Sequence, residues 1–147
     1  MYKIMIIDDD TTSLAISKAL LEDEYEVVVM SSGLQALGYL KDYPEIDLIL
    51  LDMMMPGTDG MTVLHELKAD PHTRNIPVIF STSLDGMNMR ADALTAGASD
   101  FLTKPVHQEL MKIKIAHHIQ FAECMRENKI LKQRFNLILK VLEDVDL

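Results

Sequence analysis

Polar side chains with a shared chemistry follow four of five short apolar runs along the chain. They are three carboxylates, one hydroxyl and one ammonium group, carried by Asp8, Asp9, Asp52, Thr82 and Lys104. Clustered carboxylates repel one another unless a cation neutralises them, and hard oxygen ligands on short loops suit Mg²⁺. A lysine and a hydroxyl suit phosphoryl oxygens, and a carboxylate can form an acyl phosphate. The set therefore predicts Mg²⁺-assisted phosphoryl transfer onto an aspartate.

The apolar runs that precede these residues are too short for helices and are continuous rather than alternating. This pattern favours strands buried on both faces, and helical spacing of Leu and Met lies between them. Such an order predicts an α/β fold with a five-stranded, doubly wound parallel sheet, whose ligands bind beyond the carboxyl ends of the strands. The runs are Ile4–Ile7, Val27–Met30, Ile46–Leu51, Val78–Phe80 and Asp100–Thr103. The first three helices are marked by Leu14, Leu20 and Leu21, by Leu34, Leu37 and Leu40, and by Met61, Leu64 and Leu67.

Composition excludes several classes of protein. The 147 residues suit one domain with a modest extension, and 48% of them are apolar, which is enough for a core. The net charge of −9 argues against direct binding of nucleic acid or of an anionic membrane surface. The longest apolar stretch is broken by Asp47 and Asp52, so we expect no membrane span. A single cysteine, Cys124, forms no internal disulfide, and the N-terminus does not resemble a signal peptide, so we expect a cytoplasmic protein.

The last forty residues differ from the rest of the chain. Residues 1–107 hold 17 of the 23 acidic residues, whereas residues 108–147 contain neither Gly nor Pro. These shifts predict a boundary near residue 107 followed by continuous helix. Within that helix, a stripe of residues, all but one of them apolar, recurs at alternating spacings of three and four residues. They are Phe121, Cys124, Asn128, Leu131, Phe135, Ile138, Leu142 and Val145.

This heptad seam predicts a parallel homodimeric coiled coil. Asn128 falls at an a position, where a buried Asn can set register and oligomeric state, and Glu127 and Lys132 fall where they can pair between chains. Leu139 and Val141 blur the seam. A helix that folds back on its own domain, or one that links to an output domain, stays open as an alternative.

Several motifs carry a resemblance to a known family, in matching order and spacing. The chain resembles the receiver domain of two-component response regulators over residues 2–118, which implies a flavodoxin-like receiver fold at 1–120 and a helical extension at 121–147. The motifs are Ile6-Ile7-Asp8-Asp9, Asp52-Met53-Met54-Met55-Pro56-Gly57-Thr58-Asp59-Gly60, Pro77-Val78-Ile79-Phe80-Ser81-Thr82, Ala96-Gly97-Ala98 and Lys104-Pro105.

The resemblance assigns roles to the acidic residues. Asp52 would accept a phosphoryl group from a sensor histidine kinase or a phosphotransfer protein. Asp8 and Asp9 would hold Mg²⁺ together with Asp52 and the backbone carbonyl of Met54. The protein would then be a phosphoacceptor and not an enzyme in its own right, with transfer to Asp52 and loss from it as its only chemistry.

The resemblance also implies a conformational switch. Thr82 would move to bond a phosphoryl oxygen, Lys104 would pair with the phosphate, and the peptide bond before Pro105 would be cis. Phe101 occupies the place of the switch aromatic of the family, without the hydroxyl of a tyrosine. A face formed by the fourth helix, fifth strand and fifth helix would change shape as Thr82 moves.

Two apolar residues bear on how long the acyl phosphate lasts. Met54 lies two residues after Asp52, and Leu84 lies two after Thr82, so both flank the expected path of a hydrolytic water. Neither side chain can orient that water, which predicts a long-lived acyl phosphate.

Two other functions compete with this interpretation. Asp8-Asp9-Asp10-Thr11-Thr12 fits the D-x-D-x-T motif of haloacid-dehalogenase-type phosphatases, with Asp8 as nucleophile. That family resembles longer chains with further acidic ligands after the lysine, and it leaves Asp52 without a role. A coiled-coil scaffold that no longer signals is the other rival, and the complete acidic set argues against it.

Overall fold

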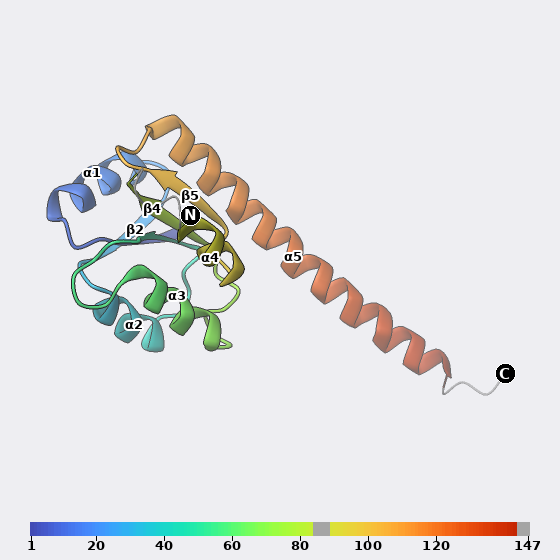
Figure 1. Ribbon diagram of the computed structural model, residues 1–147. Coiled ribbons are helices and arrows are strands. Elements are labelled where there is room, and N and C mark those ends of the chain that lie inside the picture. Colours follow the sequence, from blue (N-terminus) through green and yellow to red (C-terminus); the bar gives the residue numbers. More distant parts are fainter. Residues whose placement is uncertain (84–88, 144–147) are drawn as a thin grey trace.

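Five parallel strands form one sheet in the order β2-β1-β3-β4-β5. The computed structural model describes residues 1–83 and 89–143 (Figure 1). The strands are β1 (Lys3–Ile7), β2 (Glu26–Met30), β3 (Leu48–Asp52), β4 (Val78–Thr82) and β5 (Asp100–Thr103). The helices are α1 (Thr11–Leu21), α2 (Gly33–Asp42), α3 (Gly60–Ala69), α4 (Arg90–Thr95) and α5 (Gln108–Glu143).

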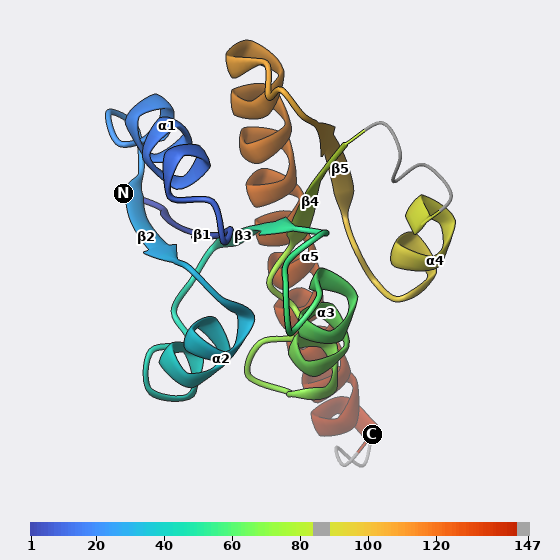
Figure 2. The same cartoon turned by 60° about the vertical axis from the view of Figure 1, so that its left-hand side comes forward.

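Helices cover both faces of the sheet, which confirms the doubly wound α/β prediction. The core on one face contains Leu14 and Leu21 of α1 with Met111 and Ile115 of α5. The core on the other face is built by α2, α3 and α4, and its largest fully buried side chain is Phe80. Figures 1 and 2 show the two layers on either side of the strands. The central strand β3 is buried along its whole length, which requires a continuous apolar run, whereas the edge strand β2 is partly exposed.

The predicted strand ends differ from the structure by one or two residues in several places, and one predicted core residue of a helix is exposed. β3 begins at Leu48 and not at Ile46, and β4 continues two residues beyond Phe80 to Thr82. Leu34 has the helical spacing of an apolar face, yet 72% of its surface is exposed. α2 instead buries Gly33, Ala36 and Leu40, and its first turn lies so close to α3 that a Cβ on Gly33 would clash with the Val63 side chain.

Side-chain caps explain why three helices begin where they do. Asp10, Ser32 and Asp59 each accept a hydrogen bond from a backbone N–H in the first turn of α1, α2 and α3, respectively. Such caps satisfy donors that have no partner within the helix. Asp10, the third aspartate of the run Asp8-Asp9-Asp10, therefore caps α1.

Helix α5 is continuous from Gln108 to Glu143, as the change in composition near residue 107 predicts. Its buried residues are Met111, Ile115 and Ile119, all in the first third of the helix. Figure 1 shows the remainder projecting away from the sheet, so the alternative of a helix folded back on its own domain is wrong for the described residues. Among the described residues, no helix is long and apolar enough to cross a membrane.

Candidate functional site

Three carboxylates meet at the carboxyl edge of the sheet. Asp8 and Asp9 follow β1, Asp52 is the last residue of β3, and β1 and β3 are neighbours. Each of the three offers an oxygen, and these oxygens lie within 4.8 Å of one another. Asp52 is only 6% exposed and Asp8 is also buried, whereas Asp9 faces solvent. A hard divalent cation fits this donor set, because it would neutralise desolvated carboxylates and keep waters on its open side.

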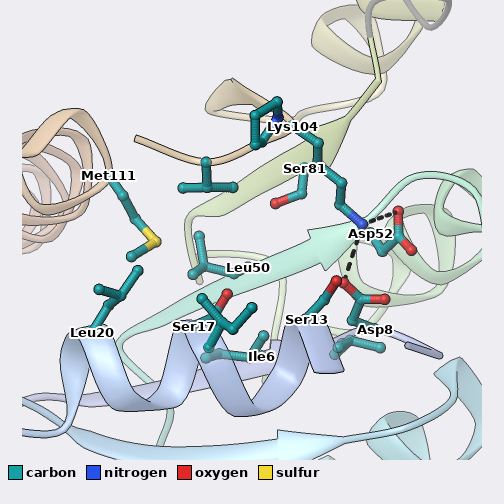
Figure 3. Close-up of a pocket in the computed structure, with 14 residues that line it drawn as sticks. Ile6, Asp8, Ser13, Ser17, Leu20, Leu50, Asp52, Ser81, Lys104 and Met111 are labelled. Atoms are coloured by element: carbon teal, nitrogen blue, oxygen red, sulfur yellow. Dashed lines mark hydrogen bonds and ion pairs between the residues drawn. The ribbon is translucent and has the colours of Figure 1, made fainter. Parts of the chain in front are cut away.

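Lys104 brings the fifth strand into the same site. Its Nζ lies 3.2 Å from Asp8 Oδ2 and 3.5 Å from Asp52 Oδ1. Figure 3 shows the side chain reaching between the two carboxylates. The backbone N–H of Lys104 donates to the Thr82 carbonyl at 2.8 Å, and the peptide bond to Pro105 is cis, as expected. The structure thus gathers residues that are almost a hundred positions apart in the chain.

Burial and crowding of charge shift the pKa values of the site. Burial raises the pKa of Asp52 most, the Asp8 carboxylate raises it further and Lys104 opposes them, which brings it from 3.8 to about 6. Burial lowers the pKa of Lys104, but the carboxylates of Asp52 and Asp8 raise it by more, so the ammonium stays charged. The site therefore holds a surplus of negative charge that a bound cation would relieve.

Thr82 and Phe101 lie beside the acidic cluster on β4 and β5. Thr82 is fully buried, and its hydroxyl donates to the Ser83 carbonyl at 3.2 Å. Phe101 is buried and stacks on Phe80, with ring centroids 6.0 Å apart. Within the described residues, no hydrogen bond joins Thr82 to Asp52. The switch roles of Thr82 and Phe101 stay predictions.

Sequence reasoning missed three basic residues that contact β5, namely Arg90, Lys114 and His118. Arg90 of α4 donates to Thr103 Oγ1 at 3.0 Å and lies 5.4 Å from the centre of the Phe101 ring. Lys114 of α5 donates to the Phe101 carbonyl at 2.6 Å, and both Lys114 and His118 pair with Asp100. The four-residue spacing of Lys114 and His118 places them on one side of the helix. That spacing is the sequence feature that could have indicated a shared acidic partner.

A cavity of about 460 Å³ opens from the acidic cluster toward the gap between α1 and α5. Asp8, Asp52 and Lys104 form its polar end (Figure 3). Its apolar walls come from Ile6, Ile16, Leu20, Leu50, Val106 and Met111. The phosphoacceptor candidate therefore stands at one end of an apolar groove.

Two sequence-based predictions reach into residues 84–88 and 144–147. Leu84 and Val145 lie outside the described residues. Met54, the other residue expected near a hydrolytic water, is 63% exposed. The described members of the heptad seam, Phe121 to Leu142, are not buried against the domain.

Comparisons with known proteins agree with this geometry. The family model described as response regulator receiver domain matches residues 4–116. The chain is 42% identical over 134 residues to the response regulator PleD of Caulobacter vibrioides, covering 90% of this chain and 28% of that protein. It is 31% identical over 134 residues to the cyclic di-GMP phosphodiesterase response regulator RpfG of Xanthomonas campestris, covering 89% and 34%. The chain thus spans about a third or less of the length of these curated relatives.

Solved structures show the same fold. A response regulator receiver domain protein from Clostridium thermocellum superposes with a TM-score of 0.80 at 33% identity, covering 85% of this chain and 99% of that one. A structure described as adenylate cyclase from Rhodopirellula baltica has a TM-score of 0.83 at 26% identity, covering 89% and 96%. Matching motifs, a matching family model and a shared sheet order all lead to one assignment: the chain belongs to the receiver domain family of two-component response regulators.

Proposed function

We propose that Asp52 is the phosphoacceptor of this receiver and that Asp8, Asp9, Asp52 and the backbone carbonyl of Met54 hold Mg²⁺. The observation that carries this proposal is the position of Lys104, whose ammonium lies between the buried carboxylates of Asp8 and Asp52. Paired buried carboxylates with a single cation leave a net negative charge, which a divalent ion would balance.

In the proposed reaction, a carboxylate oxygen of Asp52 attacks phosphorus and forms an acyl phosphate. The bond from phosphorus to the donor nitrogen of a phosphohistidine breaks, and its electron pair stays on the imidazole. Lys104 stabilises charge on the phosphoryl oxygens, and Thr82 supplies a hydroxyl from β4. Bound Mg²⁺ would neutralise the entering phosphoryl group. Catalysis here is positioning and charge balance, so the chain acts as a phosphoacceptor whose chemistry is transfer of the phosphoryl group to Asp52 and its later loss by hydrolysis.

The test is Mg²⁺-dependent labelling with acetyl phosphate, followed by trapping of the acyl phosphate and its location by mass spectrometry. We expect one adduct, on Asp52, that is lost when EDTA removes the metal. An adduct on Asp8 would support the phosphatase alternative instead. That alternative needs Asp10 as a further catalytic acid, yet Asp10 caps α1 by accepting from Thr12 N–H at 3.0 Å.

The apolar groove beside Asp52 supports a macromolecular phosphoryl donor. The cavity opens beside Asp52 and is lined by residues of α1, so a helix of a sensor histidine kinase or phosphotransfer protein that presents a phosphohistidine there would pack on α1. Ile16 lines the cavity on that helix, and more than half of its surface is exposed. Its apolar side chain is suited to burial against such a helix.

Replacing Ile16 with Asp should slow transfer from a phosphorylated histidine phosphotransfer protein by roughly tenfold, because a charge would be buried in the contact. Labelling by acetyl phosphate should be unchanged, since that donor needs no protein contact. Ala19→Asp is the matched control, because Ala19 is exposed on α1 and does not line the cavity. Equal rates for the two variants with the protein donor would contradict this docking site.

We also propose a division into a receiver at residues 1–120 and a coiled-coil stalk at residues 121–147 that forms a homodimer. Exposure of the seam residues of α5, together with the Asn128 position, supports this. A cytoplasmic location belongs to the same proposal, supported by the lone cysteine Cys124.

Leu131→Asp should convert the dimer to monomer at micromolar concentration, because a d-position charge would be buried between two helices. Sedimentation analysis measures the change in mass. Gln133→Asp introduces the same side chain on the outward face of the same turn and should leave the dimer intact. A dimer that survives Leu131→Asp would rule out this seam.

A further inference from the structure

Three consecutive methionines follow Asp52, and they differ in their access to solvent. Met53 is fully buried and Met55 is 8% exposed, whereas Met54 is 63% exposed. A thioether in contact with solvent can react with dissolved oxidants, and a thioether inside the core is shielded from them. Met54 is therefore the one methionine of this run that a small oxidant can reach.

Met54 also lies directly beside the acidic cluster. Its backbone N–H donates to Asp52 Oδ1 at 3.2 Å, which holds the residue against the buried carboxylate. Among the described residues, the other exposed methionines are Met1 and Met125. Met1 precedes β1 at the amino edge of the sheet, and Met125 lies on the projecting part of α5. An accessible thioether beside the phosphoacceptor is thus specific to Met54.

We infer that Met54 is a site of reversible oxidation and that its sulfoxide shortens the life of the acyl phosphate on Asp52. This rests on the phosphoacceptor proposal above and adds redox control to the same site. The oxidant is hydrogen peroxide. Its O–O bond breaks, one oxygen atom bonds to Met54 Sδ, and the other leaves as water. The sulfur loses two electrons, and the peroxide gains them.

Oxidation changes what the Met54 side chain can do to water. A thioether sulfur is a weak hydrogen-bond acceptor, whereas the sulfoxide is polar and presents an oxygen that accepts hydrogen bonds. An acceptor beside an acyl phosphate can orient a water for attack on phosphorus. The water oxygen then bonds to phosphorus, and the bond from phosphorus to the Asp52 oxygen breaks. Its electron pair returns to the carboxylate, and inorganic phosphate leaves.

The backbone groups of Met54 are not altered by this modification. The carbonyl proposed to hold Mg²⁺ and the N–H that donates to Asp52 both remain. Because the side chain is exposed, the added oxygen displaces nothing from the core. Oxidation should therefore accelerate the loss of the phosphoryl group while changing the rate of labelling little. This difference distinguishes a local effect at Met54 from general oxidative damage.

Peptide mass spectrometry of the peroxide-treated protein tests where the oxygen is added. Sulfoxide should form on Met54 and on Met125, which is exposed but remote from the acidic cluster, well before it forms on Met53. Oxidation of Met125 without oxidation of Met54 would overturn the inference.

Decay of the acyl phosphate tests the effect of the oxygen. The treated protein is labelled with acetyl phosphate and Mg²⁺, the donor is removed, and the remaining label is followed with time. Decay should be about tenfold faster than in the untreated protein, a small part of what a well-placed base supplies. Methionine sulfoxide reductases should restore the slow decay. Met54→Leu is the matched control, because its side chain is apolar and has no sulfur, while Cys124 and Met125 remain open to oxidation.

Each result has a distinct meaning. Faster decay after peroxide in the wild type, with no change in Met54→Leu, supports the inference. Unchanged decay in the oxidised wild type overturns it, and so does equal acceleration in Met54→Leu, which would assign the effect to another oxidised group. These two results leave Asp52 as the phosphoacceptor. Absence of labelling before any oxidation would overturn the phosphoacceptor proposal together with this inference.

Discussion

We expect Asp52→Asn to abolish Mg²⁺-dependent labelling by acetyl phosphate while leaving the fold intact. The amide has the shape of the carboxylate but lacks its nucleophilic charge, so neither an acyl phosphate nor a full set of metal ligands can form. Phosphate incorporation measured by mass spectrometry checks this, with Asp23→Asn as an exposed control. Labelling that persists in Asp52→Asn at another carboxylate would move the acceptor away from β3.

The same variant should be more stable than the wild type at pH 7 in the presence of EDTA, by about 3 kcal/mol, since each unit of pKa shift corresponds to about 1.4 kcal/mol. The folded pKa of Asp52 is about 6 against an ordinary value of 3.8. Between these values the folded state holds a proton that the unfolded chain has lost, so the wild-type free energy of unfolding falls as pH rises from about 4 to about 6.

An asparagine side chain does not titrate in this range, so the free energy of unfolding of Asp52→Asn should not show this fall between pH 4 and pH 6. Urea unfolding at pH 4.5 and at pH 7 measures the free energy at both ends of the range. The two proteins should differ least at the lower pH. A constant difference at both pH values would show that ionisation of Asp52 does not oppose folding.

Gly60→Ala should destabilise the protein by about 3 kcal/mol, the upper range for overpacking. A Cβ on Gly60 would lie 2.7 Å from the Asp52 carbonyl oxygen, 2.8 Å from Phe80 Cε1 and 2.9 Å from Met53 Cα. Two of these atoms belong to the backbone of Asp52 and Met53, and both residues are buried. Relief would require α3 to move away from the carboxyl end of β3.

Gly38→Ala provides the matched control. Gly38 lies inside α2, and a Cβ there would meet nothing within 4 Å. Alanine has the better helix propensity, so this variant should gain up to about 1 kcal/mol. Urea denaturation of both variants at pH 7 gives the comparison, and a Gly60→Ala protein as stable as Gly38→Ala would contradict the close approach of α3 to β3.

The acidic cluster could be predicted from sequence because parallel strands end at one edge of a sheet. Asp8 and Asp52 follow neighbouring apolar runs, so any parallel pairing of those runs brings them together. Lys104 was placed by the same reasoning, and the structure puts it within 3.5 Å of both. The strand pattern thus predicts which side chains share one edge of the sheet, but not the distances between their charged atoms.

Other contacts depend on packing that periodicity does not encode. Leu34 has the spacing of a core residue, but the close approach of α2 to α3 leaves it in solvent. Arg90 lies in a six-residue helix, too short for a pattern, and reaches Phe101 only because of how α4 sits beside β5. Asp10 follows Asp8 and Asp9 and so resembles a further carboxylate of the site. It is recognisable as a helix cap only once the first residue of α1 is known.

Tyr2, at the start of the chain, contacts α5 near the point where the helix leaves the sheet. Its hydroxyl donates to Glu123, just beyond the last buried residue of α5, Ile119. From Ile119 to Glu143 the helix rises about 36 Å. A tilt of about 5° at that point would sweep the far end through roughly 3 Å, which is comparable to the width of an atom. A small tilt of α5 about this contact would therefore be amplified into an atomic-scale displacement at the far end of the helix.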